Sequence, residues 1–118
     1  MDNYHLIDKG THIIIDIYEI SNNDILKYSN SIINILNKIT NEFKLNIVNK
    51  AIHQFEPFGV TGVYVLAESH LSIHTFVEER KVAMDLYTCR NLTDTNNIIN
   101  YIKELFGICK ITYKIIER

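Results

Sequence analysis

The order of the expected elements constrains this chain more than any other sequence feature. Its hydrophobic patterns predict one strand, a helix, four strands in succession, a second helix and a last strand. Two helices among these strands are too few for a parallel sheet built from strand–helix–strand repeats. The pattern therefore predicts an α+β fold, in which a mainly antiparallel sheet carries both helices on one face.

Each expected strand is rich in β-branched and apolar residues, and each expected helix has apolar residues three and four positions apart. The strands are predicted over 12–20, 45–55, 60–67, 71–77, 82–89 and 109–116, and the helices over 21–43 and 95–106. The apolar stripe of the first helix is formed by Ile25, Tyr28, Ile32, Leu36, Ile39 and Phe43. Ser21 and Asp24 fit a capping box at the start of this helix, and Thr93 or Asp94 is expected to cap the second.

The sheet face opposite the helices is expected to be an uncovered apolar surface. Alternation along the strands predicts two sets of side chains that each share one face: His70, Ser72, His74 and Phe76, and then Ala83, Asp85, Tyr87 and Cys89. A second copy of the same chain is the natural cover for such a face. We therefore expect a dimer in which two sheets stack face to face, with the helices outside (αββα).

Length, charge and cysteine content limit the classes to which this chain can belong. Its 118 residues fit a single domain. The net charge is −2 and no basic block occurs, so the chain lacks the electrostatic signature of nucleic-acid binding. No apolar run approaches the roughly 18 residues of a membrane span, and residues 1–10, an expected loose lead-in, lack the apolar core of a signal peptide. Cys89 and Cys109 are expected to be reduced thiols in a soluble cytoplasmic protein.

Most side chains capable of chemistry lie within residues 59–76, which read GVTGVYVLAESHLSIHTF. An apolar run leads directly into Glu68, Ser69 and His70, as in a buried strand that delivers polar groups to one point. A serine in this position is most often an ordinary polar residue at a strand end. The functional alternative is a self-processing serine, whose hydroxyl attacks the carbonyl of Glu68 and converts the peptide bond into an ester.

Such an attack requires a strained turn and hydrogen-bond donors for the oxyanion. Thr61 and His74 are the available hydroxyl and imidazole. Taken alone, His74 is more often a hydrogen-bonded core histidine and Cys89 a small buried hydrophobe. As a catalytic thiol, Cys89 would have to point into the same pocket as Ser69.

Two other chemistries are weakly supported by this stretch. His70 and His74 lie about 13 Å apart along a strand at ~3.3 Å per residue, which makes them a poor pair of metal ligands. We therefore expect no metal site. A hydrolase triad is also weak, because Ser69 stands in A-E-S-H-L and not in a G-x-S-x-G elbow.

The words GVTGVYVLAESHLSIHTF, followed by MDLYTC, resemble the prokaryotic-type S-adenosylmethionine decarboxylases, the pyruvoyl enzymes of polyamine synthesis. The resemblance covers residues 11–116 and is dense over 55–89. It implies a proenzyme that cuts itself between Glu68 and Ser69. Ser69 would become a pyruvoyl group that forms a Schiff base with the substrate amine and acts as an electron sink.

The resemblance also implies roles for the residues around this cut. The β chain would be residues 1–68 and the α chain residues 69–118. Thr61 matches a hydroxyl that assists processing, where relatives commonly have serine. His74 matches the histidine that removes the α-proton of the ester, and Cys89 matches the thiol that protonates the product after decarboxylation.

Substrate binding and assembly are implied in the same way. Phe55 matches an aromatic residue that stacks on adenine, Tyr18 is expected on the other side of that base, and Glu78 matches a carboxylate that binds the ribose hydroxyls. The family's processed protomers pair into a homodimer. The expected activity is decarboxylation of S-adenosylmethionine for spermidine biosynthesis.

Departures from the family pattern lie next to the substrate region. The family usually has an aromatic-Pro-Glu turn after the histidine strand, whereas residues 76–81 here read FVEERK. Arg90 stands where a glycine usually follows the cysteine. One alternative is the same pyruvoyl chemistry on arginine or ornithine, and another is an inactive homologue that serves as a regulatory or structural subunit. Retention of Ser69, His74 and Cys89 together argues against the inactive homologue.

Overall fold

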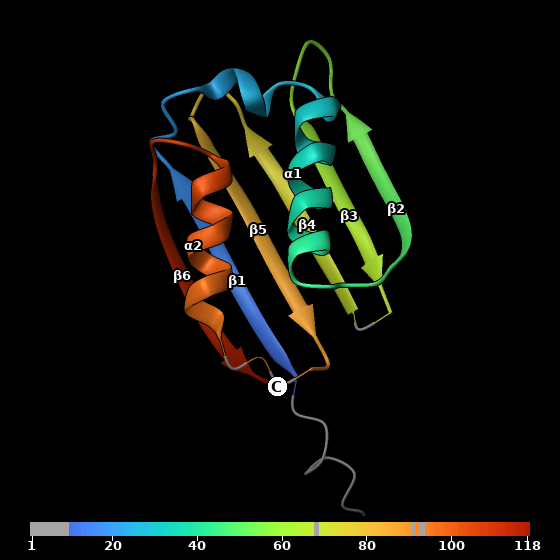
Figure 1. Cartoon of the computed structure of the whole chain (residues 1–118). Coiled ribbons are helices and arrows are strands. Elements are labelled where there is room, and N and C mark those ends of the chain that lie inside the picture. The colour runs from blue at the N-terminus through green and yellow to red at the C-terminus, as the bar shows by residue number, and fades with distance from the viewer. Residues whose placement is uncertain (1–9, 68, 91, 93) are drawn as a thin grey trace, which may run out of the picture.

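The computed structural model describes residues 10–118 except residues 68, 91 and 93, and the described part forms one sheet with helices on one side (Figure 1). The strands are β1 (Thr11–Tyr18), β2 (Ile47–Gln54), β3 (Val60–Leu66), β4 (Ser69–Phe76), β5 (Lys81–Thr88) and β6 (Lys110–Glu117). The helices are α1 (Ser29–Glu42), α2 (Thr95–Leu105) and a short 3-10 helix, η2 (Asn23–Leu26). The predicted lead-in lies outside the described residues apart from Gly10.

The strands follow the order β2-β3-β4-β5-β1-β6, and every neighbouring pair is antiparallel. α1 and α2 both lie on the same face of the sheet (Figure 1). The core fills the space between these two layers, where Ile13, Ile15 and Ile17 of β1 are fully buried. The predicted α+β fold, with an antiparallel sheet and two helices on one face, is confirmed.

The face of the sheet without helices, which we call the open face, is less apolar than predicted. It carries the polar side chains of His12, Asp16, His70 and Asp85, all of them half-buried. Large apolar side chains lie among them, and Val65 and Phe76 are 44% and 42% exposed. The alternation predicted for residues 70–76 and 83–87 is confirmed by the burial pattern of β4 and β5.

The prediction of one continuous helix from Ser21 is wrong. Asn22 caps η2 by accepting from the Asp24 N–H, and α1 begins only at Ser29, after an extended Tyr28 (φ −125°, ψ 152°) whose side chain is 55% exposed. The reason is a contact distant in sequence. The Gln54 side chain accepts from the Ser29 N–H at 2.6 Å and donates to the Lys27 carbonyl at 3.0 Å, which satisfies backbone groups that a continuous helix would use internally.

The other boundaries follow the predictions closely. β1 ends at Tyr18 because Glu19 adopts a positive φ of 52°. β4 begins at Ser69, two residues earlier than predicted. Asp94 caps α2 by accepting from the Asn97 N–H at 3.3 Å, while Thr93, the alternative cap, lies outside the described residues. No helix of the described part is long and apolar enough to span a membrane.

We predict that Gly10→Ala destabilises the protein by about 1–3 kcal/mol through overpacking. A Cβ at Gly10 would lie 2.7 Å from the Thr88 carbonyl oxygen and 2.9 Å from the Tyr87 ring, and backbone atoms of a paired strand cannot move aside easily. Chemical denaturation monitored by circular dichroism measures the change. Gly62→Ala is the matched control, since its closest contact is the flexible end of Ile52. An equal loss in both variants would contradict this explanation.

Candidate active site

Ser69 lies at the first position of β4, where the chain enters the middle of the sheet. It pairs with Thr88, the last residue of β5, and the exposed Cys89 follows Thr88 directly. Ser69 and Cys89 are thus brought to the same end of two neighbouring strands. Glu68, the residue before the predicted cut, lies outside the described residues.

Thr61 and His74 meet on the open face at the opposite end of β4. They face each other across the β3–β4 pair, and Thr61 Oγ1 lies 3.2 Å from His74 Nδ1. His74 is exposed and Thr61 is half-buried. A hydroxyl therefore orients an imidazole that solvent or a partner surface can reach.

These two pairs of residues are well separated within one chain. Ser69 and His74 are five positions apart on a single strand, which corresponds to about 16 Å at ~3.3 Å per residue. Ser69 also follows the alternation of Leu71 and Ile73, which are buried beneath the helices, whereas His74 belongs to the open face. The structure thus divides the predicted processing residues into two half-sites, Ser69 with Cys89 and Thr61 with His74.

Phe55 and Glu78, two predicted substrate residues, line one cavity. This cavity of about 380 Å³ is also lined by Phe58, Gly59, Thr75, Val77 and Glu79. Phe55 is 47% exposed and its ring packs edge-on against His53, which pairs with Thr61 across β2 and β3. The cavity therefore lies at the Thr61–His74 end of the sheet and offers an aromatic ring beside two carboxylates.

Neither Arg80 nor Lys81, the two cations of the turn that departs from the family pattern, is among the residues that line this cavity. Arg80 donates from Nη1 to the carbonyls of Ile20 (3.2 Å) and Ser21 (2.6 Å), so its charge holds the segment that follows β1. The Lys81 ammonium lies 5.7 Å from the centre of the Phe76 ring. The lining of the cavity contains acids and no basic residue.

Tyr18 lies at the end of β1, on the open-face side of the alternation. The strands β5, β4 and β3 separate β1 from β2, after which Phe55 follows. At ~4.8 Å between strands this is roughly 19 Å, so one chain does not bring both aromatic side chains to a single adenine. The role of Tyr18 in substrate binding stays a prediction.

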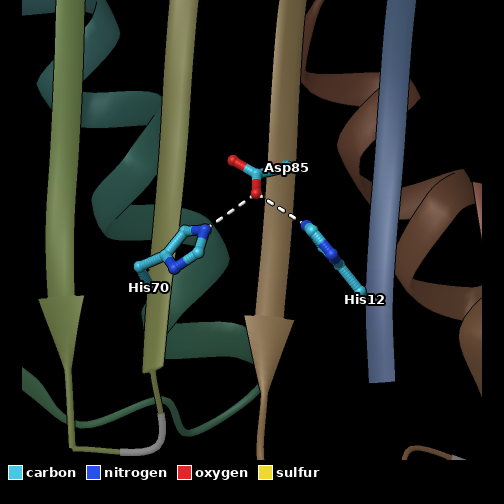
Figure 2. A group of neighbouring side chains, drawn as sticks. All are labelled: His12, His70 and Asp85. Carbon is cyan, nitrogen blue, oxygen red and sulfur yellow. Dashed lines mark hydrogen bonds and ion pairs between the residues drawn. The ribbon is translucent and has the colours of Figure 1, made fainter. Parts of the chain in front are cut away.

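The structure also reveals a polar cluster that sequence reasoning missed, formed by His12, His70 and Asp85 (Figure 2) together with Ser72. Asp85 Oδ2 lies 2.8 Å from His12 Nε2 and 2.7 Å from His70 Nε2, and Ser72 donates to Asp85 Oδ1. Burial alone would raise the pKa of Asp85, but hydrogen bonds from Ser72, His70 and His12 outweigh it and hold the pKa below its ordinary value. Alternation placed these side chains on strand faces, but only the pairing of β1 with β5 brings His12 to the others.

The two thiols of the described part differ in environment. Cys89 is exposed at the end of β5. Cys109 is half-buried, and this burial raises the pKa of its thiol. The two sulfur atoms are not joined in a disulfide.

Comparison with known proteins first identifies the class. The fold superposes on the crystal structure of the adenosylmethionine decarboxylase from Aquifex aeolicus with a TM-score of 0.84 and 31% sequence identity, over 94% of this chain and 91% of that one. The architecture is therefore that of an adenosylmethionine decarboxylase. The family model described as S-adenosylmethionine decarboxylase matches residues 11–118. The chain belongs to the S-adenosylmethionine decarboxylase family.

Curated relatives agree with this assignment. The chain is 36% identical over 109 residues to an S-adenosylmethionine decarboxylase proenzyme of Clostridium botulinum, covering 92% of this chain and 93% of the relative. It is 39% identical over 102 residues to the proenzyme of the same name from Thermodesulfovibrio yellowstonii, covering 86% and 74%. Both similarities extend across the two half-sites and the cavity.

Proposed function

We propose that this protein cuts its own chain between Glu68 and Ser69, forms a pyruvoyl group from Ser69 and decarboxylates S-adenosylmethionine for spermidine biosynthesis. Family membership supports this, and so does the description of its relatives as proenzymes. When present, the pyruvoyl group supplies an electron sink for the electron pair that departing carbon dioxide leaves behind. Side chains of this protein carry out the other steps of processing and catalysis.

The architecture around Ser69 suits a cut at this bond. β3 ends at Leu66 and β4 begins at Ser69, so the bond lies between two strands and not within one. β3 pairs with β2 as well as with β4, and β4 pairs with β5 as well. The cut would therefore leave β3 and β4 each paired with a strand on both sides.

The proposed processing reaction uses only the chain and water. Ser69 Oγ attacks the carbonyl carbon of Glu68, and the bond from that carbon to the Ser69 nitrogen breaks, which turns the amide into an ester. His74 then removes the α-proton of residue 69, and the bond between Cβ and Oγ of that residue breaks, which releases residues 1–68 as a carboxylate and leaves a carbon–carbon double bond at residue 69. Addition of water and loss of ammonia leave the keto group, with no net oxidation. Thr61 orients the His74 imidazole for this step through their hydrogen bond.

The separation of the half-sites supports a homodimer with composite active sites. In one chain His74 lies too far from Ser69 to take its proton. A two-fold axis that lies between two stacked sheets and runs across the strands reverses the strand direction. It would bring Cys89 and the end of β4 that carries Ser69 in one copy over Thr61 and His74 of its partner. Each dimer would then hold two equivalent sites.

One observation carries the assignment of the substrate: Phe55, Glu78 and Glu79 line the same cavity beside the Thr61–His74 pair. An aromatic ring suits adenine, a carboxylate suits ribose hydroxyls, and the acidic surroundings suit a substrate with sulfonium and ammonium charges. Ornithine has no group that stacks on Phe55, and arginine, whose guanidinium can stack on an aromatic ring, has no ribose hydroxyls for Glu78. The cavity thus favours S-adenosylmethionine over the basic amino acids.

We predict that the processed protein releases labelled carbon dioxide from S-adenosylmethionine and at least a hundredfold less from arginine or ornithine. The reason is that loss of the stacking and ribose contacts removes several kcal/mol of binding, and about 1.4 kcal/mol corresponds to tenfold. The measurement is carbon dioxide release from carboxyl-labelled substrates at equal concentration. Phe55→Ala should raise KM for S-adenosylmethionine, whereas Tyr28→Ala, at an exposed aromatic residue outside the cavity, is the matched control. Activity on the basic amino acids alone would contradict the proposal.

A further inference from the structure

Asp85 is the centre of a hydrogen-bonded cluster that spans three neighbouring strands. His70 comes from β4, Asp85 from β5 and His12 from β1 (Figure 2). One carboxylate oxygen of Asp85 accepts from both imidazoles, and the other accepts from Ser72. The cluster lies on the open face, and Asp85 stands three positions before Thr88, the residue that pairs with Ser69.

The same three residues could in principle hold a metal ion, because two imidazoles and a carboxylate offer ligand atoms within 4.8 Å of one another. Their geometry argues for hydrogen bonds instead. Nitrogen-to-oxygen distances of 2.7 and 2.8 Å are shorter than the roughly 3.3 Å between two ligands of a tetrahedral zinc ion. They are ordinary lengths for charge-assisted hydrogen bonds.

The environment of His12 supports the same conclusion. Arg118 Nη1 lies 3.3 Å from His12 Nδ1, and its guanidinium also lies 5.2 Å from the centre of the Tyr87 ring. Because a guanidinium only donates, Nδ1 must accept and the proton of a neutral His12 must lie on Nε2, pointing at Asp85. A metal-binding histidine normally donates from its other nitrogen to an acceptor, which is the reverse of this arrangement.

We propose that Asp85 is a positioning residue that fixes the end of β4 at which the chain is cut and the cofactor forms. His70 directly follows Ser69, so a hydrogen bond on its ring restrains the backbone on the C-terminal side of the cut. Ser72 adds a second point of attachment two residues further along the strand. His12, which Arg118 contacts at its other ring nitrogen, holds Asp85 itself from β1.

This restraint matters most after cleavage. Residue 69 then begins a chain, and strand ends that are not tied down fray. The cluster attaches that end to β5 and β1 through side chains, in addition to the backbone pairing with Thr88. The reactive group would thus keep its place in the dimer site. This inference rests on the proposed self-processing, and the experiment separates the two.

The test measures cleavage during cell-free synthesis of wild type, Asp85→Asn, His70→Leu and His70→Gln. Asp85→Asn and His70→Leu should slow cleavage by about 10²-fold, since misplacement of a reacting group by about 1 Å has an effect of that size. His70→Gln should stay within a few-fold of wild type, because its side-chain amide offers an N–H donor near the position of Nε2. Asp24→Asn, which removes an exposed carboxylate far from this cluster, is the control.

A second measurement distinguishes positioning from simple stabilisation. On the cleaved fraction of Asp85→Asn, kcat for S-adenosylmethionine should fall while KM stays within about twofold, because Phe55 and Glu78 are untouched. Wild-type cleavage rates in both Asp85→Asn and His70→Leu would overturn the positioning role alone. The positioning role would also be overturned if His70→Gln and His70→Leu slowed cleavage equally and in proportion to their loss of melting temperature. An uncleaved wild-type chain would overturn the proposed function as well. One-to-one zinc binding that is lost in His12→Gln would show that the cluster is a metal site and not a set of hydrogen bonds.

Discussion

Denaturing mass spectrometry of the purified protein should show two fragments, residues 1–68 and 69–118, and no intact chain. The C-terminal fragment should be lighter by one ammonia than simple hydrolysis would leave it, because conversion of Ser69 to a pyruvoyl group expels its nitrogen. Ser69→Ala has no hydroxyl for the attack and should remain a single chain. The change is all-or-none, since no other side chain at this position can form the ester.

Variants of the supporting residues give graded outcomes in the same measurement. Thr61→Val keeps the shape of the side chain but removes the hydroxyl bonded to His74, and cleavage should slow by roughly 10²-fold. Thr61→Ser keeps the hydroxyl and should cleave at least as fast as wild type. Ser21→Ala, at an exposed serine outside both half-sites, is the matched control. A single intact wild-type chain, or a cut at another bond, would refute the proposed processing.

Two variants that are each unable to cleave should restore cleavage when they are expressed together. His74→Ala retains Ser69 but lacks the imidazole, and Ser69→Ala retains Thr61 and His74 but has nothing to cut. If each site combines the Ser69 half-site of one copy with the His74 half-site of its partner, mixed dimers contain one complete site. Mass spectrometry should then detect a C-terminal fragment that carries alanine at position 74.

The identity of that fragment makes the test specific. The Ser69→Ala chain must stay whole, so any fragment arises from the His74→Ala chain through its partner. Each variant expressed alone gives the background, and sedimentation analysis of wild type should give a dimer. Absence of the fragment from dimers shown to be mixed would refute the composite site. It would require instead that His74 reach Ser69 within one chain, across about 16 Å of strand.

Much of this fold could be predicted because the alternation of residues along each strand indicates which side chains share a face. The alternation along β4 and β5 was sufficient to predict that Ser72 and His74 share one face of their strand, and that Asp85 shares a face with Ala83 and Tyr87. The break before α1 could not be predicted, because it depends on Gln54, which reaches Lys27 and Ser29 only after the sheet has formed. Local capping patterns carry no information about such a contact.

The residues of the site could be predicted from the sequence better than their arrangement in space. Thr61 and His74 were expected to cooperate, and the register of β3 against β4 brings them together. The cluster around Asp85 depends on β1 inserting beside β5, a pairing of residues 65 to 77 positions apart that no short pattern encodes. The separation of Ser69 from His74, by contrast, follows from strand rise alone and was open to calculation from the sequence.

The strand order has a further consequence for a chain that is cut before β4. The N-terminal product would contribute β1, β2 and β3, and the C-terminal product β4, β5 and β6. Because β1 lies between β5 and β6, the two products would be interleaved and not merely docked side by side. Their separation would require the ladders β3–β4, β5–β1 and β1–β6 to open together. The two polypeptides would therefore persist as one folded unit after the cut. Neither of them alone would contain the complete sheet.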